Sequence, residues 1–171
     1  MIIQCTKLLA DELKIKVTKP DLTNENQLLC WHAHLFKIGR AKCIMLMNNV
    51  TRYNFIIYGL LKKDFANIEE IIKKELSSNF FGDEYTEEEI NKYLNDLGEL
   101  RFAATSDRSI ISQLNDTIYI TEHTIYSQSE KGTTISIYEL NRSSNNIPMS
   151  KLKGTYFPSK AMKAALNANL M

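Results

Sequence analysis

The sequence contains few of the residues that mark a fibrous, low-complexity or disulfide-held protein. Its 171 residues include only three prolines and six glycines, which excludes a collagen-like or linker-rich chain. The three cysteines, Cys5, Cys30 and Cys43, lie far apart and form no Cys-x-x-Cys pair. Because an odd and sparse set is a poor disulfide framework, we expect a reducing, cytoplasmic environment.

Long hydrophobic runs and an excess of one charge are also absent. The densest apolar run, residues 43–47, is far shorter than the roughly 20 residues that span a bilayer. Residues 1–14 contain Lys7 and no long apolar stretch, so they do not resemble a signal peptide. Lysine and arginine number 21 against 20 aspartates and glutamates, which leaves a net charge of +1. We therefore expect no membrane association, and the overall charge indicates no partner.

What the sequence does contain is an ordinary globular composition. Hydrophobic residues make up 44% of the chain and charged residues 24%, as in typical soluble domains. The length fits about one domain, and neither an internal repeat nor a Gly-, Ser- or Pro-rich linker divides the chain. We therefore predict a single domain over residues 1–171.

The clearest strand signal is a set of three apolar or aromatic runs between residues 28 and 59. They cover residues 28–38, 42–48 and 53–59, and Gly39 with Arg40 can form a two-residue hairpin turn. The breaks are shorter than the dozen or so residues that a parallel crossover needs, so the runs predict an antiparallel meander. The middle run has no polar face between its turns, which predicts a strand covered on both sides.

Helices and short strands surround this meander in the predicted fold. Apolar residues at three- and four-residue spacing predict several helices, which follow positions 6, 64, 86, 107 and 158. Thr86 and Glu89 form the capping-box pattern of a helix start. Short strands are expected near 1–5 and 99–104, whereas residues 117–141 are compatible with either strand or helix. The fold class is therefore α+β, an antiparallel sheet covered by several helices.

Charge is uneven along the chain although its total is close to zero. Residues 37–63 carry six cations and no acid. Residues 64–99 carry eleven acids and three lysines, and residues 131–171 carry six cations and one acid. The strand region and the C-terminal part are therefore basic, and the helices between them are acidic.

The basic strand region is the first candidate for function. Its candidate binding residues are Lys37, Arg40, Lys42 and Arg52. The aromatic residues interleaved with them are Phe36, Tyr53, Phe55 and Tyr58. Cations and stackable rings on a sheet are typical of proteins that bind single strands or RNA, and a nucleotide or phosphorylated ligand would suit the same surface. In the alternative, the rings lie in the core and the cations pair with the acidic helices that follow.

A pair of histidines in the first run is the second candidate. Alternate residues of a strand share a face, so His32 and His34 would lie about 7 Å apart and in line with Cys30. His-x-His spacing occurs in metal sites, although zinc needs a third or fourth ligand from elsewhere. In the alternative, both histidines lie on a partly exposed face and hydrogen-bond to neighbours. The opposite face would then belong to the core, with Trp31, Ala33 and Leu35.

Signals of other catalytic chemistry are weak. No Gly-x-Ser-x-Gly turn surrounds Ser109, and helix capping by Ser106 or Asp107 explains this segment better. The glycines are isolated and match no phosphate-binding loop. Cysteines in apolar runs are usually inert packing residues. We therefore predict no nucleophilic catalytic residue.

Several segments resemble a known family. They are MIIQCTKLLADEL at the start, then CWHAHLFKIGRAKCIMLMNN, TSDRSIISQLND and the late LNRSSNNIPMSKLKGTYFPSKAM. Together they resemble a family of bacterial and phage proteins that is described as a domain of unknown function. The resemblance implies a compact intracellular domain and a helix around residues 135–141. It supplies no catalytic residue.

Two hypotheses from different classes follow. In the first, the chain is a non-enzymatic module that contacts nucleic acid or a protein partner through the basic hairpin. In the second, it is a small metal-dependent or nucleotide-acting enzyme centred on His32 and His34. We expect no cofactor under the first hypothesis, whereas zinc is the candidate metal under the second.

Overall fold

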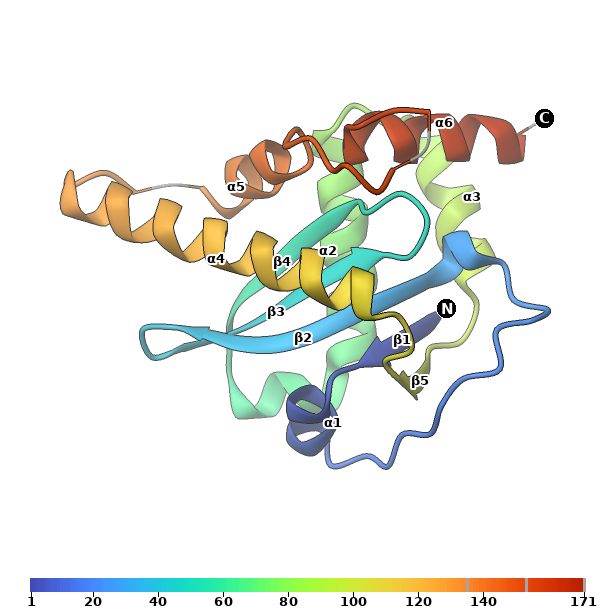
Figure 1. Ribbon diagram of the computed structural model, residues 1–171, viewed down its shortest axis with the longest axis horizontal. Coiled ribbons are helices and arrows are strands. Elements are labelled where there is room, and N and C mark those ends of the chain that lie inside the picture. The colour runs from blue at the N-terminus through green and yellow to red at the C-terminus, as the bar shows by residue number, and fades with distance from the viewer. Residues whose placement is uncertain (135, 153, 171) are drawn as a thin grey trace.

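A five-stranded mixed sheet forms the centre of the fold (Figure 1). The computed structural model describes residues 1–134, 136–152 and 154–170. The strand order is β4-β3-β2-β1-β5. The strands are β1 (Ile2–Cys5), β2 (Cys30–Ile38), β3 (Ala41–Asn48), β4 (Asn54–Leu60) and β5 (Arg101–Ala104). The antiparallel pairing of β2, β3 and β4 confirms the predicted meander. β1 pairs in parallel with both β2 and β5, which the sequence did not predict.

Side chains alternate along the strands, and the two largest clusters of buried hydrophobic residues lie on opposite faces of the sheet. Trp31, Leu35 and Leu46 join the larger core, whereas Met45 and Met47 face the other way into the smaller core. β3 is therefore buried on both faces along most of its length, as its unbroken apolar run predicts. Trp31 is fully buried on the predicted core side.

The described residues form six α-helices, which cover both faces of the sheet. They are α1 (Lys7–Leu13), α2 (Ile68–Gly82), α3 (Glu87–Leu97), α4 (Arg108–Glu130), α5 (Ile137–Ser144) and α6 (Pro158–Leu170). Apolar residues of α1, α2, α3 and α6 enter the larger core, and those of α4 and α5 enter the smaller one. In Figure 1, α4 crosses in front of the strands and α2 runs behind them. The α+β class is therefore confirmed.

Local sequence accounts for several helix boundaries. The predicted capping box begins α3, where Thr86 and Glu89 exchange side-chain and backbone hydrogen bonds. Asp107 caps α4, because its carboxylate accepts from the backbone N–H of Ser109 at 2.7 Å. The predicted helix after position 64 starts later than expected: a 3-10 segment, η2 (Lys62–Asn67), precedes α2.

The segment for which strand and helix were both open is largely helical. Ile110, Leu114 and Ile118 form one buried stripe at four-residue spacing, and α4 continues from it to Glu130. The helical period of the buried residues thus outweighs the strand propensity of the β-branched ones. The helix that the resemblance implied around 135–141 corresponds to α5, although residue 135 lies outside the described residues.

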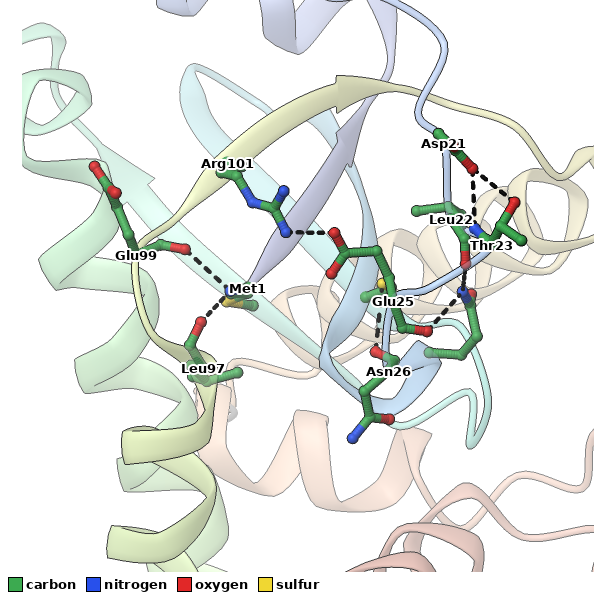
Figure 2. Close-up of polar contacts among 11 residues, drawn as sticks. Met1, Asp21, Leu22, Thr23, Glu25, Asn26, Leu97, Glu99 and Arg101 are labelled. Atoms are coloured by element: carbon green, nitrogen blue, oxygen red, sulfur yellow. Dashed lines mark hydrogen bonds and ion pairs between the residues drawn. The ribbon is translucent and has the colours of Figure 1, made fainter.

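The loop between α1 and β2 is fastened at the β5 edge of the sheet (Figure 2). Glu25 of this loop forms an ion pair with Arg101 of β5, with 2.7 Å between the Glu25 Oε1 and the Arg101 Nη2. Beside it, the amine of Met1 donates to the carbonyl oxygens of Leu97 and Glu99. These contacts fix the edge that is opposite to β4 in the strand order.

Candidate functional site

The hairpin between β2 and β3 brings cations together at one end of the sheet. Lys37 and Lys42 are cross-strand partners, and Arg40 lies in the turn that joins their strands. η2 lies beside them, because the Nζ of Lys42 is 5.5 Å from the centre of the Phe65 ring. We call the cations of this end the basic hairpin surface. They are Lys37, Arg40, Lys42, Lys62 and Lys63.

Among the described residues, Lys42 alone of the basic hairpin surface forms an ion pair, at 2.6 Å from its Nζ to the Glu12 Oε1. The other four cations are exposed and form none. The contacts do not support the alternative in which the acidic helices neutralise these cations. Glu69 of α2 pairs with Lys73 of the same helix, and Glu89 caps α3. Four of the five cations of this end are therefore not neutralised by ion pairs among the described residues.

The aromatic residues of this region mostly belong to the cores. Three of the four rings interleaved with the cations are buried: Phe36, Tyr53 and Phe55. Tyr58 is 45% exposed, but it pairs with Cys43, whose side chain faces the smaller core. Tyr58 therefore points away from Lys42, the neighbour of Cys43 in β3. The expected stacking surface is not present on the face that carries Lys37 and Lys42.

Arg52 is separated from the other predicted binding residues. It lies in the turn between β3 and β4, at the opposite end of β3 from Arg40. Only 9% of its surface is exposed. Its Nε donates to the Oε1 of Gln113 at 2.7 Å, and its Nη1 donates to the carbonyl oxygen of Asn49. The structure thus groups Lys37, Arg40 and Lys42 but leaves Arg52 out of the basic hairpin surface.

Both histidines face the side of the sheet that α4 covers. The expectation that this face is partly exposed is wrong for His32, which is fully buried, and His34 is half-buried. The Nδ1 of His32 donates to the Oδ1 of Asn49 at 2.8 Å, and the Nδ1 of His34 lies 2.8 Å from the hydroxyl oxygen of Thr6. Burial lowers the pKa of both imidazoles, so both are neutral at pH 7.

His32 lies opposite Gln4 of β1 in the parallel register. The Oε1 of Gln4 accepts from the hydroxyl of Ser106. The Nε2 atoms of Gln4 and His32 are both buried and have no hydrogen-bond partner among the described residues. Because Nδ1 of His32 carries the proton, its Nε2 has a free lone pair, whereas the Gln4 amide offers N–H groups. Two buried polar atoms without partners are a costly feature of this face of the sheet.

The residues around the histidines do not form a metal centre in the described part of the chain. No group of three or more His, Cys, Asp and Glu side chains comes within reach of one ion there. Zinc needs three or four such ligands. The nearest partners of His32 and His34 are instead the side chains of Asn49 and Thr6. The geometry therefore gives the zinc hypothesis no support.

The cysteines have the environment of packing residues. Cys5, Cys30 and Cys43 are buried and free. Burial raises the pKa of all three thiols, that of Cys5 to about 12. Nucleophilic cysteines need a lowered pKa and some access to solvent, so none of these thiols fits that role.

Two groups of cations were not among the site residues chosen from the sequence. Lys62 and Lys63 join the hairpin through η2. Lys151 and Lys160 meet Arg52 around a cavity beside α6. The excess of cations between residues 131 and 171 was the only sequence signal for the second group.

Comparisons with known proteins bear on the family. No curated protein and no solved structure matches the chain. None of the helices in the described part of the chain combines the length and apolar character that crossing a membrane requires. One family matches residues 2–161, a span that includes every strand, the basic hairpin surface and both histidines. That family is described as Domain of unknown function (DUF6933), and the chain belongs to it.

Proposed function

We propose that this protein is a non-enzymatic module that binds the phosphate backbone of nucleic acid through the basic hairpin surface. The observation that carries the proposal is the absence of ion pairs at Lys37, Arg40, Lys62 and Lys63 among the described residues. These four exposed cations lie at one end of the sheet, beside a fifth, Lys42. Clustered cations of this kind bind polyphosphates by releasing counterions.

The buried rings favour backbone contacts over base recognition. Proteins that read unpaired bases stack them on exposed aromatic side chains. Phe36 and Phe55 are in the cores, and Tyr58 points to the other face. We therefore expect binding that depends little on sequence.

A pair of matched double variants tests where the nucleic acid binds. Lys37→Gln with Arg40→Gln removes two exposed cations of the basic hairpin surface. Lys19→Gln with Lys163→Gln removes the same charge from exposed positions elsewhere. Fluorescence anisotropy with labelled RNA and DNA measures both affinities at the same low salt concentration.

The hairpin variant should bind every sequence more weakly. The slope of its log affinity against log salt should be shallower by the equivalent of about two phosphate contacts. The control variant should bind nearly as the wild type does. If the two variants lose affinity equally, the interaction is a diffuse charge effect and the hairpin is not the site. If the hairpin variant binds nucleic acid as tightly as the wild type does, the proposed surface is wrong as well.

The proposal includes a cytoplasmic location in bacteria or in phage-infected cells. Its support is the set of three buried, unpaired cysteines, since oxidising compartments favour disulfide-bonded proteins. Fractionation of a native host with an antibody against the chain checks the location. Recovery from the periplasm or the medium would contradict it.

A further inference from the structure

A cavity of about 670 Å³ lies at the far end of β3 from the hairpin. Its walls come from the turn between β3 and β4, from the segment before α6 and from the first half of α6. Small-molecule sites typically measure about 300–1,000 Å³. The cavity therefore has room for a metabolite-sized ligand.

The polar part of this cavity is positive. Arg52, Lys151 and Lys160 line it, and no aspartate or glutamate does so among the described residues. The lining also includes the apolar side chains of Val50, Ala161 and Ala164. A ligand that suits this mixed lining combines an anionic group with a less polar body.

Arg52 is the unusual member of this set because its buried charge forms no direct ion pair, although the more distant carboxylate of Asp107 acts on it. Its two hydrogen-bond partners, the Gln113 side chain and the Asn49 carbonyl, are both neutral. No carboxylate lies within ion-pair distance of it among the described residues, and its Nη2 has no hydrogen-bond partner there. Burial of a cation without a directly paired counterion is costly, and it lowers the pKa of Arg52 despite the opposing charge of Asp107. A bound anion would reduce that cost.

The backbone of Arg52 is also in a costly conformation. Its φ is 59°, in the left-handed region that residues other than glycine rarely adopt. Such conformations persist where the surrounding structure holds them, often at binding sites. Here the hydrogen bond from the Arg52 N–H to the Asn48 carbonyl oxygen, at 3.1 Å, closes the turn that presents the side chain.

We propose that this cavity binds a small molecule through its phosphate group. A guanidinium presents paired N–H donors that match phosphate oxygens, and the two ammonium groups add charge without a fixed geometry. The site lies at the other end of β3 from the basic hairpin surface and concerns a different ligand, so it goes beyond the proposed function.

Thermal unfolding with two probes, inorganic phosphate and AMP, tests the proposal at constant ionic strength. A ligand that binds only the folded state raises the Tm. The informative variant is Lys151→Gln with Lys160→Gln, which removes two exposed cations of the cavity and leaves the buried Arg52 in place. Lys163→Gln is the control, because Lys163 is on the same helix but does not line the cavity.

Phosphate and AMP should raise the Tm of the wild type and of Lys163→Gln, and the double variant should lose this increase. General stabilisation by excluded phosphate does not depend on these lysines, so an equal increase in the double variant would overturn the proposal. So would the absence of any increase in the wild type. The double variant keeps the basic hairpin surface, so its affinity for nucleic acid should be unchanged, and the two proposals can fail separately.

Discussion

The side-chain amide of Asn145 pairs with both backbone groups of Asn54, as a neighbouring strand would. Its Oδ1 accepts from the Asn54 N–H at 2.8 Å, and its Nδ2 donates to the Asn54 carbonyl oxygen at 2.7 Å. One turn earlier, the Oδ1 of Asn141 accepts from the N–H of Ile56 at 2.9 Å. β4 is an edge strand, and these asparagines occupy backbone groups that could otherwise recruit another chain.

Replacing Asn145 with alanine should therefore destabilise the protein strongly. The change leaves a buried N–H and a buried carbonyl of Asn54 without these partners, and each unsatisfied group costs about 1–3 kcal/mol. We expect the free energy of unfolding, measured with denaturant, to fall by about 2–4 kcal/mol. Ser143→Ala is the control, because Ser143 is exposed on α5 and the change should cost about 0.5 kcal/mol or less. Similar losses in both variants would mean that the edge pairing contributes little.

The long-range contacts of these asparagines could not be predicted from the sequence. The segment that contains them was recognised as part of a family pattern, but nothing local in it indicates a partner 85 or 91 residues away. Contacts of that range depend on how α5 packs against β4. The strand order could not be predicted for the same reason, because β1 inserts between β2 and β5 without any local signal of parallel pairing.

Features encoded within a few residues were predictable. Short turns around Gly39 and Arg40 specify antiparallel neighbours, and Thr86 with Glu89 specifies a helix start. The face of His32 was also predictable from alternation, but its burial was not. That burial comes from α4, whose stripe at Ile110 and Leu114 packs on this face of the sheet. The predicted binding residues do not form one site for a similar reason. Arg40 and Arg52 are close in sequence but lie at opposite ends of a strand.

Trp31→Ala should be among the most destabilising substitutions. Trp31 is fully buried, its ring packs edge-to-face on Phe55 with centroids 5.7 Å apart, and its Nε1 donates to the Tyr93 hydroxyl at 3.1 Å. Truncating a buried aromatic costs about 3–5 kcal/mol. Denaturant unfolding measures the loss, with Tyr119→Ala on the exposed side of α4 as the comparison. An unchanged midpoint for Trp31→Ala would refute the assignment of faces along β2.

Stability should fall as the solution becomes mildly acidic. Burial lowers the folded-state pKa of His32 and His34 below the ordinary value of 6.5. Between the lowered and ordinary values the unfolded chain binds more protons than the folded one, so protonation favours unfolding. The histidine contribution is fully present above the ordinary pKa of about 6.5 and is lost as the pH falls from there through the lowered pKa values of the folded state.

This dependence is checked by measuring the free energy of unfolding from about pH 7.5 down to about pH 5, a range around the ordinary histidine pKa of about 6.5. His32→Gln should flatten the slope, whatever its effect on absolute stability. The same slope in the wild type and in His32→Gln would show that His32 does not cause this dependence.

Metal analysis addresses the alternative function directly. The histidines hydrogen-bond to Asn49 and Thr6, and no cluster of three candidate ligands is present among the described residues. We expect the purified protein to contain zinc or iron well below one atom per chain, and a chelator to leave its Tm unchanged. Stoichiometric metal that disappears in His32→Gln would instead favour an enzyme centred on the histidines.

The central claim is that the basic hairpin surface binds nucleic acid, and a salt titration of the wild-type protein tests it most directly. Labelled single-stranded RNA and DNA are titrated at several salt concentrations, starting at about 50 mM, where electrostatic attraction is strong. With four unpaired cations in contact with phosphates, the logarithm of the affinity should fall with the logarithm of salt at a slope of about −3. Sequence should matter little. No detectable binding to either probe at the lowest salt would contradict the account and leave a protein partner as the occupant of this surface.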